Sequence, residues 1–225
     1  MIRFLRYIPA ILLIFIVPIV SSGLYAWTAT AQTQGGSSAV EIIEITADGN
    51  IEYDNQKKVI TADKNVVAVY GFRTIRGDRM SFEEKSQKLM VTGSVRIKES
   101  AANGWAMACN EMTYLVNDNR IFATGAISAS MDNAQLSGNS LEADFHAGTA
   151  RLQGNCRLVY EDITATGDIV DFDRNSRKAQ VTGNAQVKSG GRVFSGGKIT
   201  IFLNEKRVVG SEGTRLVIPI EKQKQ

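Results

Sequence analysis

Apolar and polar residues alternate with a period of two along most of the chain after its first forty residues. In one stretch Leu89, Val91, Gly93, Val95 and Ile97 share one side of the alternation, and the other side is mostly polar. The same arrangement recurs over residues 121–129, 150–158 and 179–187. Alternation of this kind predicts β-strands with one buried face. No window of twelve residues in this part has the period of a helix.

A glycine stands at the middle of the apolar side of each of these strands, at Gly93, Gly125, Gly154 and Gly183. A glycine inside a strand marks a bulge or a sharp bend. We therefore expect each strand to fold over at its glycine, with its apolar residues inside the bend. Polar segments at 54–56, 83–86, 116–119, 147–148 and 173–176 suit hairpin loops, so neighbouring strands should be antiparallel.

The strands belong to a repeat of about thirty residues. Apolar residues that begin equivalent segments stand at positions 51, 80, 112, 141, 170 and 199, in steps of 29, 32, 29, 29 and 29. A fixed period of this length is typical of repeat proteins, whose units stack because none can bury its own apolar face. Proline is absent between Ile19 and Ile218, as continuous strand pairing requires. The predicted fold is an all-β, elongated stack of V-bent antiparallel strands.

The N-terminal segment has the pattern of an export signal. Arg3 and Arg6 precede an apolar run over 7–20, and Ala29-Thr30-Ala31 offers a cleavage site. We expect cleavage after Ala31. Because residues 4–26 are just long enough to span a bilayer, a retained membrane anchor is the alternative. The predicted organisation is a signal over 1–31, a flexible lead-in over 32–40, the repeat domain over 41–220 and a tail over 221–225.

Composition and charge argue against several classes of function. The chain has 26 basic and 23 acidic residues in mixed order, a poor footprint for nucleic acid. One histidine and two cysteines make neither a histidine zinc site nor a disulfide scaffold. Cys109 falls at a strand corner and Cys156 on an apolar face, and these unlike positions disfavour a disulfide between them. We expect no catalytic residues, no metal and no cofactor.

The repeat resembles that of the OstA/LptA family. Residues 77–95 and 167–185 both follow the pattern Gly-Asp-x-apolar-x-aromatic, a polar turn, and then an apolar strand with a central glycine. The resemblance covers about residues 45–218. Ala143 and Ile201 replace the aromatic, Asp63-Lys64 replaces the first Thr-Gly, and the last unit is degenerate, as terminal repeats often are. The resemblance implies a periplasmic β-jellyroll, open along one side, in a bridge that moves lipopolysaccharide between the membranes.

The ligand that this resemblance implies is the lipid A part of lipopolysaccharide, held in an apolar trough inside the bends. At about 0.8 kcal/mol per methylene, exposing an acyl chain of some twelve carbons to water costs on the order of 10 kcal/mol. The alternative is that the same residues only pack as a closed core. The expected lining is Ile51, Tyr53, Met80, Phe82, Leu89, Val91, Val95, Ile97, Met112, Tyr114, Ile121, Ile127, Leu141, Leu152, Leu158, Val170, Phe172, Val181 and Val187.

Recurrent polar residues outside this lining have simpler expected roles. Asp78 and Asp168 occupy one repeat position, which indicates hydrogen bonds at strand corners rather than a carboxylate site. The cluster of Arg73, Arg76 and Arg79 is within reach of a lipid phosphate, but a solvated strand face is the more frequent meaning of such a run.

The partners follow from the stack and from the resemblance. The terminal strands of a stack have unpaired backbone groups, so we expect head-to-tail self-association through about 42–60 and 198–220. The resemblance adds inner-membrane LptC-like and outer-membrane LptD-like proteins. Two alternatives stay open. One is an inner-membrane-anchored LptC-like protein that passes lipopolysaccharide from the ABC transporter to the bridge, and the other is an extracellular structural β-solenoid.

Overall fold

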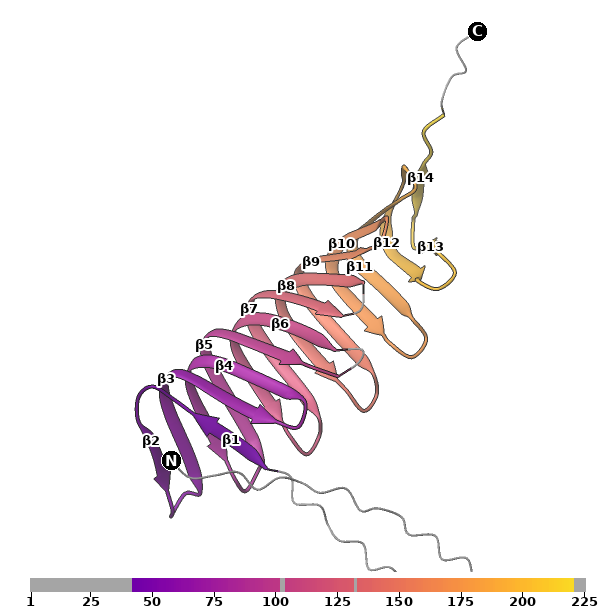
Figure 1. The fold of residues 1–225 in the computed structure, drawn as a ribbon. Coiled ribbons are helices and arrows are strands. Elements are labelled where there is room, and N and C mark those ends of the chain that lie inside the picture. Colours follow the sequence, from indigo (N-terminus) through magenta and orange to yellow (C-terminus); the bar gives the residue numbers. More distant parts are fainter. Residues whose placement is uncertain (1–41, 102–103, 132, 221–225) are drawn as a thin grey trace, which may run out of the picture. The chain divides into compact units, whose positions relative to one another are not determined.

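The structure is a computed structural model that describes residues 42–101, 104–131 and 133–220. The predicted signal, lead-in and tail lie outside these residues. The described part contains antiparallel strands and no helix, which confirms the all-β prediction (Figure 1). The strands are β1 (Ile43–Thr46), β2 (Ile51–Asp54), β3 (Val59–Tyr70), β4 (Arg73–Glu83), β5 (Lys88–Glu99), β6 (Trp105–Leu115), β7 (Arg120–Met131), β8 (Ala134–Asp144), β9 (Thr149–Tyr160), β10 (Ile163–Asp173), β11 (Lys178–Ser189), β12 (Arg192–Phe202), β13 (Arg207–Ser211) and β14 (Arg215–Val217).

All fourteen strands form one open sheet in which β3 to β12 follow one another in sequence order. The short strands β1 and β2 both pair with β3, on 67–70 and on 59–62. In the same way β13 and β14 both pair with β12. Each end of the sheet is therefore a bent strand that is interrupted at its bend, and each leaves an unpaired edge.

Every long strand bends near its middle, where the pairing register shifts. In β5 the bend is made by Gly93 and Ser94, with φ of 80° and 48°. A Cβ atom on Gly93 would lie 2.2 Å from an oxygen of Asp78 on the neighbouring strand, so the position has no space for a side chain. The predicted glycine bends are confirmed.

Polar side chains hydrogen-bond across the corners. Asn184 donates from its side-chain amide to Asp168 at 3.0 Å, and Asn65 donates to Asp48 at 2.8 Å. These bonds agree with the role expected for the recurrent Asp168.

The two ends of the strands are joined differently. At one end, four-residue turns cover 55–58, 84–87, 116–119, 145–148, 174–177 and 203–206. The first N–H of each turn donates to the last carbonyl of the turn before it at 2.9–3.1 Å, from Glu84 to Lys58 and so on to Leu203 and Arg177. At the other end, two-residue links are the rule, as at 71–72 and 190–191. Five residues separate β5 from β6, and these three extra residues account for the one repeat step of 32.

The bends divide the sheet into two arms that face each other. We call the strand halves next to the four-residue turns the turn arm and those next to the short links the link arm. In β4 and β5, for example, residues 79–83 and 88–92 belong to the turn arm, and 73–77 and 95–99 to the link arm. The apolar faces of both arms form one buried cluster. Because no other layer covers this face in the described part, the sheet encloses its own core.

Both cysteines are buried in this cluster as free thiols. The prediction that they stand on unlike faces was wrong. Cys109 does lie at the bend of β6, next to the register shift between Ala108 and Glu111, but its side chain points inward. Burial raises the pKa of the Cys109 thiol to about 11 and also raises the pKa of Cys156.

The bend at Gly93 is testable through stability. Gly93→Ala should lower the free energy of unfolding by about 2–4 kcal/mol, because a left-handed backbone and an overlap with Asp78 act together. The matched control is Gly71→Ala, which has φ of 55° but nothing within 4 Å of the new methyl group, and it should cost only about 1 kcal/mol. Urea unfolding followed by circular dichroism measures both. Equal losses would contradict the steric role of the bend.

The buried thiols give a second test. A raised pKa keeps a thiol protonated at pH 8, and the thiolate is the reactive species, so folded protein should react very slowly with iodoacetamide. In denaturant without reductant, both thiols of the chain should be alkylated, as counted by mass spectrometry. No alkylation under those conditions would mean that the two cysteines form a disulfide.

Candidate functional site

The candidate site is the space between the two arms. One apolar cluster runs through it from Ala62 to Leu203, and no polar or charged residue of the described part is buried. All nineteen predicted lining residues except Ile51 and Tyr53 belong to this buried cluster. The inside of the sheet is therefore continuously apolar from β3 to β12.

Ile51 and Tyr53 are exposed because they lie on an edge. Both stand on β2, opposite Ala62 and Ile60 of β3, and so belong to the inner face. No strand of the described part lies beyond β2, so Ile51 remains 51% exposed and Tyr53 47% exposed. The end of the stack thus leaves apolar inner-face side chains uncovered.

The sequence prediction missed the link-arm half of the even-numbered strands. In β6, Trp105, Met107 and Cys109 point inward before the bend, and Met112 and Tyr114 do so after it. At each bulge the odd-numbered strand has one residue more than its even-numbered neighbour. In β6 the inward positions therefore change from odd to even numbers at the bend. β4 and β10 also change from odd to even, and β8 changes from even to odd. A second alternation, of opposite parity, precedes the apolar residues that begin the repeated segments, and it was the signal that could have revealed these residues.

The arms meet across the mouth of the V. Trp105, the first residue of β6 on the link arm, stacks on Phe145 in a turn, with ring centroids 4.9 Å apart and planes at 23°. Trp105 is only 6% exposed. Neither residue was predicted as part of the site, although both stand where the trough would have to open.

Arg73 makes a second contact across the mouth. Its Nε donates to Glu99 at 2.8 Å within the link arm, and its Nη1 donates to Asn119 of a turn at 2.7 Å and to the Tyr114 hydroxyl. The guanidinium also lies 4.8 Å from the ring centre of Phe145. We call Arg73, Tyr114, Asn119 and Phe145 the clasp.

The three arginines near residue 76 therefore do not share one face. Arg73 is half-buried inside the mouth, whereas Arg76 and Arg79 are exposed on the outer side, before and after the bend of β4. The expectation of a single solvated face was wrong for Arg73. Its partners belong to β6 and to the turn after β6, two strands further along the sheet than β4, so the two arms are offset by about one repeat where they touch.

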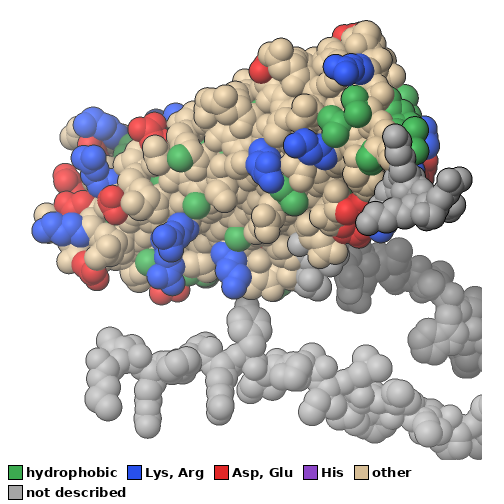
Figure 2. Space-filling model, turned by 90° about the horizontal axis from the view of Figure 1, so that it is seen from above, with side chains coloured by type: hydrophobic (Ala, Val, Ile, Leu, Met, Phe, Trp, Pro, Cys, Tyr) green, Lys and Arg blue, Asp and Glu red, His purple; other side chains and the backbone are tan. Residues whose placement is uncertain are grey.

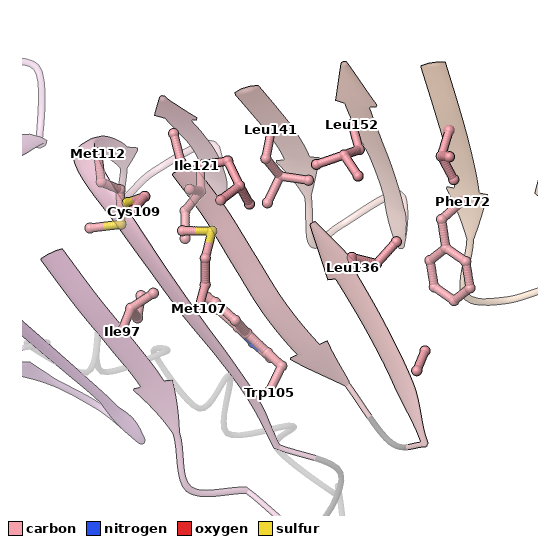
Figure 3. Close-up of a cluster of buried hydrophobic side chains, with 14 of the residues drawn as sticks. Ile97, Trp105, Met107, Cys109, Met112, Ile121, Leu136, Leu141, Leu152 and Phe172 are labelled. Atoms are coloured by element: carbon pink, nitrogen blue, oxygen red, sulfur yellow. The ribbon is translucent and has the colours of Figure 1, made fainter. Parts of the chain in front are cut away.

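A small cavity of about 40 Å³ lies beneath the Trp105–Phe145 pair. Its walls are almost wholly apolar and include Met107, Leu136, Leu141 and Phe172 (Figure 3). This space holds roughly one water molecule at most. An acyl chain would fit here only if the arms moved apart.

The hollows on the outer side have a different character. One of about 430 Å³ is lined by the ion pairs Arg120–Glu142 and Arg151–Asp171, and another of about 770 Å³ by Arg76, Arg96 and Lys98. In the face seen in Figure 2, charged side chains are spread widely and hydrophobic ones stand mostly singly, apart from a group at the right-hand end. These surfaces suit water better than acyl chains.

The described residues show neither a metal centre nor a spanning helix. They contain no group of three or more His, Cys, Asp or Glu side chains placed to hold a metal ion. Within 42–101, 104–131 and 133–220, no helix is long and apolar enough to cross a membrane.

Comparison with known proteins places the chain in a family. No match was found among the curated proteins. Among solved structures, the chain is similar to LptH, the LptA-homologous periplasmic component of the lipopolysaccharide transport device of Pseudomonas aeruginosa, with 13% identity, 80% of this chain and 96% of that chain covered, and a TM-score of 0.26. Residues 44–207 match the family described as LptA/(LptD N-terminal domain) LPS transport protein. Since this match spans well over half of the sequence, the chain belongs to that family of lipopolysaccharide transport proteins.

Proposed function

We propose that this chain is an exported periplasmic carrier that binds lipopolysaccharide between its two arms and shields the lipid A acyl chains from water. The observation that supports this most directly is the apolar cluster, which continues from Ala62 to Leu203 without a buried polar residue. Membership of a lipopolysaccharide transport family supports the choice of ligand. At about 0.8 kcal/mol per methylene, covering several acyl chains offsets tens of kcal/mol of exposure.

Loading would require the mouth to open. The arms touch at the Trp105–Phe145 pair and at Arg73, and the space beneath them is about 40 Å³. These side-chain contacts join the turn arm to the first residues of β4 and β6 on the link arm and include no strand pairing. Separating the arms therefore leaves the sheet hydrogen bonds in place, and the incoming chains replace the apolar contacts that are lost.

The two edges of the sheet support a bridge built from copies of this chain. At one edge Ile51 and Tyr53 face the inner side without cover, and at the other Leu216 lies opposite Phe194 and is 45% exposed. Pairing the β13–β14 edge of one copy with the β1–β2 edge of the next would continue the apolar cluster into the next molecule. LptC-like and LptD-like partners in the two membranes would use the same edges.

A membrane-anchored, LptC-like role is the second candidate, and the length of the stretch 4–26 around the apolar run 7–20 is the observation that favours it. This run lies outside the described residues. A mature N-terminus at Gln32, read by mass spectrometry of the protein from cells, would exclude the anchored form.

Photo-crosslinking in cells tests the ligand site. A photoreactive amino acid placed at Phe82, Tyr114 or Phe172, all buried between the arms, should attach to labelled lipopolysaccharide. The matched control is Met90, which follows the buried Leu89 on β5 but faces outward and is 42% exposed. Labelling at Met90 and at none of the three inner positions would rule out transport between the arms.

Charged residues at the edge test the bridge. Wild-type protein should show an apparent mass that rises with concentration in light scattering, because its edges pair head to tail. Ile51→Lys should keep it monomeric, since an ammonium group would be buried at the junction without a partner. Met90→Lys adds the same charge away from both edges and should associate like the wild type. A wild-type monomer at every concentration that also fails to bind its membrane partners would count against the bridge.

A further inference from the structure

We propose that Trp105 is a ligand-binding residue that donates its indole N–H to an acyl carbonyl oxygen, at the point where a fatty acyl chain joins the head group of its lipid. The inference rests on the proposed function, since it names the residue that would hold one chain of the ligand. It goes beyond an apolar trough, because it assigns one polar contact with a direction and a partner.

The starting observation is an unused donor. The Nε1 atom of Trp105 is buried and has no hydrogen-bond partner. Arg120 Nε is the other such atom in the described part, but it stands 3.7 Å from a carboxylate oxygen of Asp144. Buried donors in folded proteins nearly always find an acceptor, so an orphan at a ligand site indicates a partner that the ligand brings.

The surroundings define the chemistry of that partner. Trp105 lines the cavity together with Leu136, Leu141 and Phe172, which would accept an alkyl chain but no second polar group. The ligand atom beside Nε1 must therefore be an acceptor that is attached directly to a chain. The carbonyl oxygen of an ester or amide meets both requirements, because it accepts one N–H and continues into methylenes.

A phosphate fits this position less well. Arg73, on the same arm as Trp105, lies against the other side chain of the stacked pair, Phe145, and its guanidinium is already engaged by Glu99, Asn119 and Tyr114. With Glu99 balancing its charge, Arg73 does not present a free cation to an anionic group. The cavity beneath Trp105 is therefore suited to the neutral part of a lipid, between its head group and its chain.

The position of Trp105 also suits a contact at the level of a carbonyl. Its ring lies at the mouth, stacked on Phe145, while Leu136 and Leu141 lie further from the strand ends, on the link arm and the turn arm of β8 (Figure 3). A chain that displaced Phe145 from the indole face would run inward over these residues. Its head group would stay outside, and its carbonyl would pass the indole edge.

The test compares two single-chain probes with two proteins. The probes are a 1-acyl glycerophosphate, which has an ester carbonyl, and the 1-O-alkyl ether of the same chain length, which lacks it. The proteins are the full chain with Trp27→Phe, which leaves Trp105 as its sole tryptophan, and the same chain with Trp105→Phe, which keeps a ring against Phe145 but loses the N–H. Calorimetry gives the four affinities, and tryptophan emission follows binding to the first protein.

We expect the protein with Trp105 to bind the ester about fivefold more tightly than the ether, as one net hydrogen bond allows. Trp105→Phe should bind both probes equally, with the affinity of the ether. Leu136→Met, in the wall of the same cavity, should keep the preference for the ester while changing both affinities together.

Each contrary result has its own meaning. Equal binding of ester and ether by the protein with Trp105 overturns the role of its N–H and leaves transport between the arms intact, and this comparison needs no variant of Trp105 to fold. An ester preference that survives in Trp105→Phe overturns the assignment to this residue. Binding of neither probe, together with no crosslinks from Phe82, Tyr114 or Phe172, overturns the proposed function as well.

Discussion

An apolar sheet face must be covered, and this chain covers it with the other half of the same sheet. The described part has neither a helix nor a second sheet to do so. A left-handed pair at the middle of each odd-numbered strand from β3 to β11, such as Gly93 and Ser94, folds that strand back on itself, and the even-numbered strands paired with it bend at the same level. The common core, the two arms and the mouth between turns and links all depend on that bend.

If the chain carries lipid as proposed, the same side chains have to serve two states of the trough. In the structure, Trp105 packs against Phe145 and the apolar faces of the arms fill the space between them. If a lipid replaces these contacts, their free energy has to be given up when the lipid binds. Stronger contacts between the arms would therefore weaken the affinity for the lipid by the same amount. A clasp built from Arg73 and ring contacts suits this competition, because it is specific but local, and the strand pairing that holds the sheet does not depend on it.

Much of this fold follows from the sequence, because the period of two, the central glycines and the polar turns are local features. The residues that were missed, Trp105 and Leu136 among them, lie before the bulge of even-numbered strands, where the inward side changes parity. The contact of Arg73 with Asn119 was equally hidden. Alternation tells which side of a strand a residue occupies, but it contains no information on how far one arm slides past the other.

The strands lie across the direction in which they are stacked, and each is bonded only to its neighbours in the sheet (Figure 1). A pull on the two ends of the stack therefore acts along the interstrand hydrogen bonds, and every strand pair in the series carries the full load. The tensile strength of such a stack is that of its weakest strand pair, however many repeats it contains. A twist or a bend of the whole stack, by contrast, is divided into small changes at every strand pair. The stack therefore has a low breaking force but tolerates changes of curvature well.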